Sequence, residues 1–397
     1  MASRGDARDS QSQSQSQAVI RVAHVGGYAR DSASGPQRAV AGILQHLPDH
    51  GVEVELWQFA RNAKEVSWQE IDGIPVLRLP RRRRVPGFLI GLPDKTRAAL
   101  RTRSSQVDLV HFHSVFISEY TRAGLLLEIP YVISPRGGYN RLVLHGRNRL
   151  AKQIWLAAYE RRYLTSAKAL NAVSPGEAAE LENLVSRDQI FYVPNGIDRE
   201  ALDRPIKEPD GKTMLFLGRL AVQHKGLDRL LAGYSLFLND SGDQSSDLVL
   251  AGPDFRGDKD RIEGQIRDLG LQDRVSLTGG VFGQDKWDLI ERAYAFVLTS
   301  RWEGMPFALL EALAAGRPAL VTPETNMGAL VEEYGAGFNT TGDTKEISRG
   351  IEALLALSQE QYVEMQYQAR RLIQDQFTWE RTTGELAARY RDILRTT

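Results

Sequence analysis

Short apolar segments that end in small-residue turns recur along this chain, and they constrain its fold more than any other feature. Residues 18–25 are rich in β-branched side chains and end at Gly26-Gly27. Similar segments follow at residues 52–59, 107–113, 130–134, 167–173 and 189–193. Helical spacing lies between them, for example over residues 38–47. Apolar strands that alternate with helices indicate a parallel sheet covered on both faces.

The same pattern begins again in the second half. Apolar segments lie at residues 213–217, 247–251, 274–277, 294–298 and 318–321. Residues 199–212 carry proline and charged side chains, which favour a linker. Helical periodicity then runs through residues 347–357, 361–373 and 380–394. Because 397 residues exceed what one core usually supports, we predict two α/β domains. Their expected bounds are residues 18–200 and 201–379, with a C-terminal helix at about 380–397 able to pack back on the first domain.

Composition limits the possible locations and cofactors. Residues 1–17 alternate Ser and Gln without an apolar stretch, so we expect a disordered tail and no secretory signal. The chain has no cysteine, which excludes disulfides and thiolate metal sites. No apolar run approaches the roughly 18 residues that span a bilayer. These features predict a cytoplasmic protein.

Two carboxylates flank the start of a predicted helix. Glu303 and Gly304 follow an apolar strand, and Pro306 is expected to be the first helical residue. Backbone N–H groups up to Ala308 would then form an anion and hydroxyl site. Glu311 lies eight residues beyond Glu303, roughly 12 Å along a helix, which suits two parts of one ligand better than one glycosidic bond. The alternative is a solvated glutamate and an ordinary salt bridge.

The segment Glu303-Gly-Met-Pro-Phe-Ala-Leu-Leu-Glu311 resembles the Glu-x7-Glu signature of glycosyltransferase family 4, whose members have the GT-B fold. Further resemblances to that family are carried, in order, by His111-Phe-His113, Val193-Pro-Asn-Gly-Ile-Asp198, Gly218-Arg219-Leu220 and Lys225-Gly226. The likeness extends over residues 18–395. It implies two Rossmann-like parallel-sheet domains that face a deep cleft.

The resemblance also implies roles for residues of the second domain. Arg219 and Lys225 would hold the donor diphosphate and balance charge on the leaving nucleotide, although residues 221–224 make this loop one residue longer than in many members. Glu303 would hold hydroxyls of the transferred sugar, and Glu311 those of the ribose. The remaining donor-binding residues expected here are Gly304, Met305, Pro306 and Phe307.

In the first domain, the resemblance makes His113 the cleft residue that contacts the transferred sugar. The small residues Gly26, Gly27 and Gly35 would let backbone amides approach the sugar and phosphates. Gln37 replaces the acidic residue that the family often has in this segment. The run Ser134-Pro-Arg-Gly-Gly138 is similar to segments of members that build bacterial surface polysaccharides. We therefore expect an acceptor site with Arg136, Gly137 and Tyr139.

Taken together, these features predict a retaining glycosyltransferase that moves a hexose from a nucleoside-diphosphate-sugar to a glycan acceptor, expected to be lipid-linked. No acidic cluster for a metal is evident, so neither a metal nor another cofactor is expected. The alternatives are a sugar-nucleotide epimerase of the same architecture and a non-catalytic sugar-nucleotide-binding protein. A dehydrogenase is disfavoured because Gly26-Gly27 lacks the dinucleotide fingerprint.

Basic residues are concentrated in the first half. Residues 78–168 contain 18 Lys and Arg but 5 Asp and Glu, although the net charge of the chain is zero. Arg81–Arg84 precede the apolar stretch 85–92, and residues 141–164 mix basic, aliphatic and aromatic side chains. This mixture predicts an anionic membrane surface as a partner, on the inner face of the cytoplasmic membrane, rather than nucleic acid. The alternative is a solvated basic face.

Overall fold

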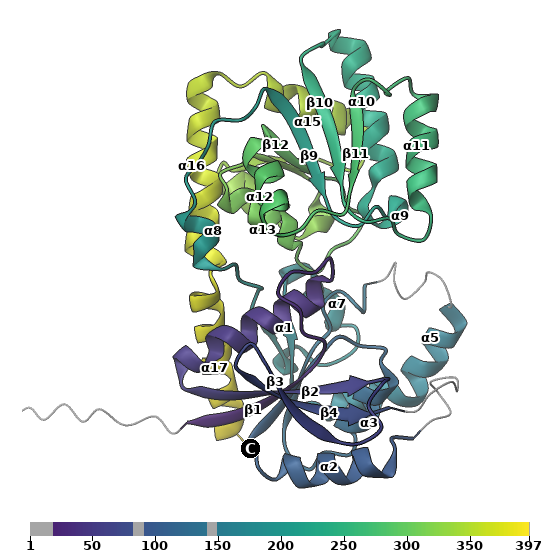
Figure 1. Ribbon diagram of the computed structural model, residues 1–397, viewed down its shortest axis with the longest axis vertical. Coiled ribbons are helices and arrows are strands. Elements are labelled where there is room, and N and C mark those ends of the chain that lie inside the picture. Colours follow the sequence, from purple (N-terminus) through teal and green to yellow (C-terminus); the bar gives the residue numbers. More distant parts are fainter. Residues whose placement is uncertain (1–18, 82–90, 141–148, 397) are drawn as a thin grey trace, which may run out of the picture.

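The computed structural model describes residues 19–81, 91–140 and 149–396, which form two α/β domains (Figure 1). The first contains an eight-stranded sheet in the order β3-β4-β2-β1-β5-β6-β7-β8. Its strands are β1 (Ile20–Val25), β2 (Val52–Ala60), β3 (Ser67–Ile71), β4 (Ile74–Pro80), β5 (Leu109–His113), β6 (Tyr131–Ser134), β7 (Ala169–Ala172) and β8 (Ile190–Tyr192). Neighbouring strands pair in parallel except for β3 and β4.

The helices of the first domain connect these strands and cover the sheet. They are α1 (Gly35–His46), η1 (Leu47–His50), α2 (Asp94–Ser104), α3 (Ser118–Gly124), α5 (Arg149–Trp155), η3 (Leu156–Glu160), α6 (Arg161–Ser166), α7 (Pro175–Leu181) and η4 (Arg187–Gln189). The short helix α8 (Arg199–Asp203) lies in the segment predicted to be a linker.

The second domain has a six-stranded sheet in the order β11-β10-β9-β12-β13-β14, and all its pairings are parallel. Its strands are β9 (Lys212–Leu217), β10 (Ser246–Ala251), β11 (Val275–Gly279), β12 (Ala295–Leu298), β13 (Ala319–Val321) and β14 (Gly337–Asn339). Its helices are α9 (Val222–Lys225), α10 (Leu227–Ser241), α11 (Asp258–Asp268), α12 (Gly283–Arg292), α13 (Phe307–Ala314), η5 (Pro323–Thr325), α14 (Gly328–Glu333), α15 (Thr344–Leu355) and α16 (Gln359–Gln376).

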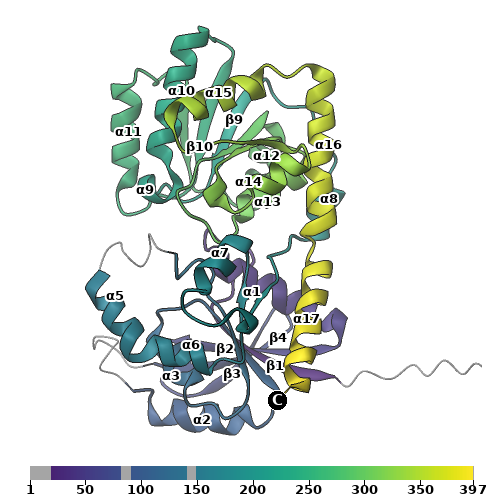
Figure 2. The same ribbon diagram turned by 180° about the vertical axis from the view of Figure 1, so that it is seen from behind.

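The last helix, α17 (Trp379–Arg395), returns to the first domain, and both views show α16 and α17 running along one side of the molecule (Figures 1 and 2). Gly42 of α1 makes this return possible, because a Cβ there would lie 2.1 Å from the Trp379 ring. Tyr390 is fully buried, and its hydroxyl lies 2.5 Å from Nδ1 of His111. The end of the chain therefore completes the core of the first domain.

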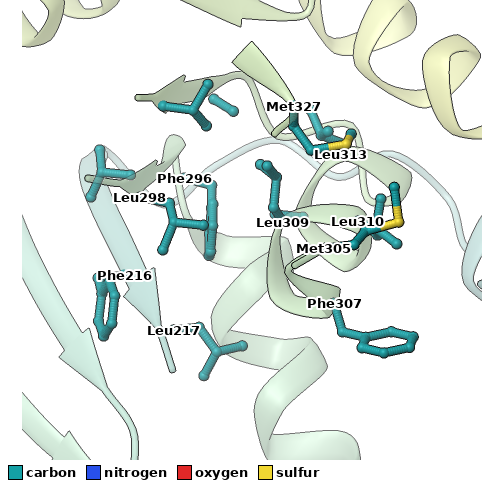
Figure 3. Close-up of a cluster of buried hydrophobic side chains, with 14 of the residues drawn as sticks. Phe216, Leu217, Phe296, Leu298, Met305, Phe307, Leu309, Leu310, Leu313 and Met327 are labelled. Atoms are coloured by element: carbon teal, nitrogen blue, oxygen red, sulfur yellow. The ribbon is translucent and has the colours of Figure 1, made fainter. Parts of the chain in front are cut away.

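The core of the second domain fixes the start of α13, where the predicted signature lies. Phe216 of β9, Phe296 of β12 and Leu309 of α13 are fully buried in one cluster (Figure 3). Each such side chain contributes about 1.5–3 kcal/mol through burial, which holds α13 against the sheet. Phe307 extends from the start of the helix, away from these side chains (Figure 3).

Three strands, β3, β4 and β14, were not predicted from the sequence. The hairpin of β3 and β4 turns at Asp72-Gly73, where both residues have positive φ, and Asp-Gly between alternating side chains is a strong hairpin signal. The third, β14, has only three residues. Within the described ranges, every helix is too short or too polar to cross a membrane.

Candidate functional site

A cleft between the domains lies at the carboxyl ends of the central strands, where ligands bind in open α/β sheets. The predicted site residues that line it are Gly35, Arg136, Gly137, Arg219, Lys225, Glu303, Gly304, Met305, Pro306, Phe307 and Glu311. The structure thus brings together residues that are up to 276 positions apart. Four other predicted residues, Gly26, Gly27, His113 and Tyr139, do not belong to the cleft lining.

Glu303 lies buried at the centre of a polar network. Its Oε1 accepts hydrogen bonds of 2.6 Å from Lys225 Nζ and 2.6 Å from Ser300 Oγ. Burial alone would raise the pKa of Glu303, but the charge of Lys225, together with the hydrogen bonds from Lys225 and Ser300, outweighs it and lowers the pKa. Although the loop at residues 221–224 is longer than in many family members, Lys225 lines the cleft and contacts Glu303. Glu303 is therefore an ionised acceptor that is paired with Lys225.

His224 supports this network from the rim. Its ring stacks on Trp302 with centroids 4.4 Å apart, and its Nε2 donates to the Trp302 carbonyl at 2.9 Å. Burial lowers the pKa of His224 to about 4, so the ring is neutral near pH 7.

The loop before α13 carries the predicted anion site, with one correction. Pro306 has φ −82° and ψ 110°, which is extended, so the helix begins at Phe307 and the prediction that Pro306 is the first helical residue is wrong. The Pro306 carbonyl accepts the first helical hydrogen bonds, including 3.1 Å from the Leu309 amide. The first backbone amides of α13 have no partner within the helix, and their residues, Phe307 and Ala308, line the cleft.

Two glycines let the domains approach each other beside this loop. Gly137 has φ +78°, and a Cβ on it would lie 3.4 Å from the Gly304 amide nitrogen. A Cβ on Gly304 would lie 3.3 Å from the Arg136 carbonyl carbon. A side chain at position 304 would fit only tightly against Arg136, and one at position 137 would be strained by the positive φ.

Glu311 is almost completely buried, yet it contacts cations from both domains. Its Oε1 accepts from Arg38 of α1 and, at 2.8 Å, from Lys286 of α12. Burial would raise the pKa of Glu311, but the charges of Arg38 and Lys286 lower it. Oε2 of Glu311 is buried and has no hydrogen-bond partner among the described residues.

Arg219 differs from the other cations of the cleft. Its guanidinium carbon lies 4.9 Å from the centroid of the Phe255 ring. Within the described part of the chain, Arg219 forms no salt bridge, whereas Lys225 and Lys286 each pair with a glutamate. Its charge is therefore available to an anionic ligand.

Arg136 is a second cation of the cleft without a salt bridge among the described residues, on the wall formed by the first domain, although the Glu177 carboxyl is near enough to raise its pKa. Its Nη1 donates to Asn195 Oδ1 at 2.8 Å, and its Nη2 lies 3.0 Å from His113 Nδ1. The Nε atom is buried without a hydrogen-bond partner, and no described carboxylate forms a salt bridge with this side chain. Burial lowers the pKa of Arg136 to about 10.

Behind Arg136 lies a cluster of three buried histidines, His24, His111 and His113, with ring nitrogens within 4.8 Å of one another. His24 Nδ1 and His113 Nε2 are 2.9 Å apart and bond to each other. Burial lowers the pKa of His24 to about 3 and the pKa values of the other two well below the usual range. In this structure the histidines are engaged within the protein, since Arg136 bonds to His113 Nδ1, and Tyr390 and Ser134 bond to His111.

The other predicted residues lie behind the cleft wall. A Cβ on Gly26 would lie 3.1 Å from Val40 of α1, and a Cβ on Gly27 would lie 3.0 Å from Gln37. Tyr139 is 3% exposed, and its hydroxyl donates to buried Glu160 at 2.9 Å. The hydroxyl of Tyr139 is therefore bonded within the first domain, and Tyr139 is absent from the cleft lining.

Sequence reasoning assigned no role to Arg38 or Lys286. Arg38 stood in the segment that contained Gly35, but its partner Glu311 is 273 residues away. Lys286 had no local signal, because nothing in the sequence shows which face of α12 meets α13.

Two family descriptions together cover most of the chain. Residues 33–201 match the family described as Glycosyltransferase Family 4, and residues 198–372 match Glycosyl transferases group 1. The two matches meet at the segment between the domains.

Full-length relatives agree with these matches. The chain is 25% identical to GDP-mannose:cellobiosyl-diphosphopolyprenol alpha-mannosyltransferase of Xanthomonas oryzae pv. oryzae, over 94% of this chain and 97% of that protein. It is 23% identical to UDP-Gal:alpha-D-GlcNAc-diphosphoundecaprenol alpha-1,3-galactosyltransferase of Escherichia coli, over 80% and 83%. Anabaena HepE, solved in complex with UDP and glucose, superposes with a TM-score of 0.70 at 16% identity, over 94% of this chain and 100% of HepE. This last likeness confirms the predicted fold.

Proposed function

The chain belongs to glycosyltransferase family 4, and from that premise we propose that it transfers a hexose from a nucleoside-diphosphate-sugar to a lipid-linked glycan acceptor, with retention of anomeric configuration. The observation that carries this proposal is the unpaired Arg219 beside the Lys225–Glu303 pair in one cleft. A diphosphate needs fixed positive charge, and a sugar needs ionised acceptors for its hydroxyls.

Each cleft group then has one task. Arg219, Lys225 and the amides at the start of α13 stabilise the charge that develops on the departing diphosphate. Glu303 accepts hydrogen bonds from sugar hydroxyls, and Glu311 accepts them from the ribose.

We assign the role of base to the donor phosphate, because cations hold both glutamates in place. The bond from the anomeric carbon to the phosphate oxygen breaks, and the acceptor oxygen bonds to the same face of that carbon. The acceptor proton passes to the phosphate.

The lipid-linked acceptor is supported by the relatives and by the first domain. The two curated relatives differ in donor, GDP-mannose and UDP-galactose, yet both names include an acceptor carried on a polyprenyl diphosphate. Arg136 places a guanidinium without a salt bridge among the described residues on the acceptor side of the cleft. Such a cation suits an anionic group of the ligand.

An assay with purified protein tests the proposal. We expect a new glycosidic product, seen by mass spectrometry, when one UDP- or GDP-hexose meets a polyprenyl-diphosphate-linked glycan. Proton NMR should show that the anomeric configuration is retained. Activity should persist in excess EDTA, since Arg219 and Lys225 supply the charge that a metal would provide; loss restored by Mg²⁺ would contradict this.

Two other outcomes would favour the alternatives. Conversion of the sugar nucleotide without any acceptor would indicate an epimerase. Tight binding of a sugar nucleotide, with no turnover on any acceptor, would indicate a binding protein.

A further inference from the structure

The two carboxylate oxygens of Glu311 have different surroundings. Oε1 accepts from Arg38 and Lys286, whereas buried Oε2 has no hydrogen-bond partner among the described residues. The side chain of Glu311 is 3% exposed, so bulk water does not satisfy the second oxygen. A buried acceptor without a partner is unfavourable, and a hydroxyl donor in the cleft would relieve that cost.

The two cations that hold Oε1 come from different domains. Lys286 lies on α12 of the second domain, close to Glu311 in the chain. Arg38 lies on α1 of the first domain and crosses the cleft. Its guanidinium carbon also lies 4.6 Å from the centroid of the Phe307 ring, at the start of α13. Arg38 therefore reaches Glu311 only while the two domains are close together.

This pairing determines the charge of Glu311. Burial favours the protonated carboxyl, while Arg38 and Lys286 together lower its pKa. If Arg38 were lost, the same burial would be opposed only by Lys286, whose Nζ also lies 4.0 Å from Asp31 Oδ1 of the first domain. The carboxylate would then be easier to protonate, and a protonated carboxyl is a poorer acceptor for hydroxyls.

We propose that Arg38 is a positioning residue of the donor site, and this rests on the proposed function. It holds Oε1 of Glu311 so that ionised Oε2 is presented to a ribose hydroxyl of the nucleotide. Because Arg38 belongs to the first domain, approach of the two domains completes a binding site located on the second. Nucleotide binding and domain closure are thereby coupled.

Calorimetry with UDP and GDP tests this at several pH values. Arg38→Met should weaken binding of whichever nucleotide binds the wild type by about tenfold or more. The affinity of this variant relative to the wild type should also fall as the pH is lowered, because titration of the nucleotide's terminal phosphate, with a pKa of about 6, affects both proteins alike. Arg38→Lys, which keeps the charge, should restore most of the wild-type pH dependence. Arg30→Met is the matched control. Arg30 is exposed in the loop before α1, and this substitution removes the same charge as Arg38→Met.

The 2′-deoxy form of the same nucleotide provides the sharper comparison. If Arg38 acts through Oε2 of Glu311 and a ribose hydroxyl, Arg38→Met should weaken binding of the ribonucleotide much more than binding of its 2′-deoxy form. A general folding defect would weaken both equally and would overturn the proposal, as would unchanged ribonucleotide affinity in Arg38→Met. If the wild type binds no nucleotide at all, the proposed function itself fails.

Discussion

Nδ1 of His113 accepts a hydrogen bond from the guanidinium of Arg136 at 3.0 Å, and this contact determines where the protons lie in the histidine cluster. Because a guanidinium only donates, the proton of neutral His113 must be on Nε2. Nε2 then donates to His24 Nδ1 at 2.9 Å. The remaining proton of His24 lies on Nε2, which is buried without a partner in the described structure. His113 thus stands behind Arg136, which itself lines the cleft.

Substitutions at His113 should distinguish positioning from direct contact with the sugar. Asparagine can place its Oδ1 near the position of Nδ1 and keep the acceptor for Arg136, whereas alanine removes it. We expect His113→Ala to lower kcat/KM by roughly 10- to 100-fold, the value of a hydrogen bond to a charged group. His113→Asn should retain most of the activity. If both variants are equally impaired, the imidazole itself contacts the transferred sugar.

The buried histidines should make stability depend on pH. In an unfolded chain their pKa is about 6.5. In the fold the pKa of His24 is about 3, and those of His111 and His113 are also lowered by burial. Below about pH 6.5 the unfolded state therefore binds protons that the native state does not, and the free energy of unfolding falls by up to about 1.4 kcal/mol per pH unit for each histidine. Denaturant unfolding between pH 7.5 and pH 5 measures this slope.

Two residues refine the measurement. Burial raises the pKa of Glu177 in the folded protein. Between its ordinary and its raised pKa, the folded state binds one proton more at Glu177 than the unfolded state does. This residue therefore opposes the loss of stability that the histidines cause as the pH falls. His24→Asn keeps an acceptor for His113 Nε2 but cannot titrate, so its slope should be shallower by about one proton. Equal slopes in this variant and the wild type would show that His24 does not contribute.

Arg219 and Arg256 form a matched pair for testing the charge in the cleft. Both guanidinium carbons lie 4.9 Å from the centroid of the Phe255 ring, but only Arg219 lines the cleft. Arg219→Ala should lower kcat by about 100-fold or more, with a smaller effect on nucleotide affinity, because charge on the leaving group grows in the transition state. Arg256→Ala should stay near the wild type. A rise in KM alone for Arg219→Ala would contradict this role.

Local sequence patterns predicted the central strands and the loop around Glu303, because each apolar run ends where its sheet meets the cleft. They missed the edge strand β3, since it is largely exposed and lacks an apolar run. They also missed Arg38 as a partner of Glu311 and Arg136 as a partner of His113. Such pairs depend on how helices and strands far apart in the chain come together, which no local spacing encodes.

Exposed apolar side chains lie on α5, within the basic segment that is predicted to contact a membrane surface. Leu150 and Ile154 of α5 are 74% and 68% exposed, and a spacing of four places them on the same face of the helix. Arg81 is already paired with Glu119 at 2.7 Å, and residues 82–90 and 141–148 lie outside the described ranges. We therefore expect α5 to insert its apolar face while neighbouring basic residues meet anionic headgroups.

Flotation with vesicles that contain an anionic lipid measures this binding. Changing Leu150 and Ile154 together to Ser should weaken it by at least about tenfold, because each buried aliphatic side chain contributes about 1.5–3 kcal/mol. Replacing Arg81–Arg84 with Ser should also weaken it, and binding should decline as salt rises, since each basic residue near the surface contributes about 1 kcal/mol. Tyr367→Ser is the control, because Tyr367 is 62% exposed on α16 of the other domain. If all variants float like the wild type, or nothing floats at low salt, the first domain does not dock on an anionic membrane through these residues, while the donor site is unaffected.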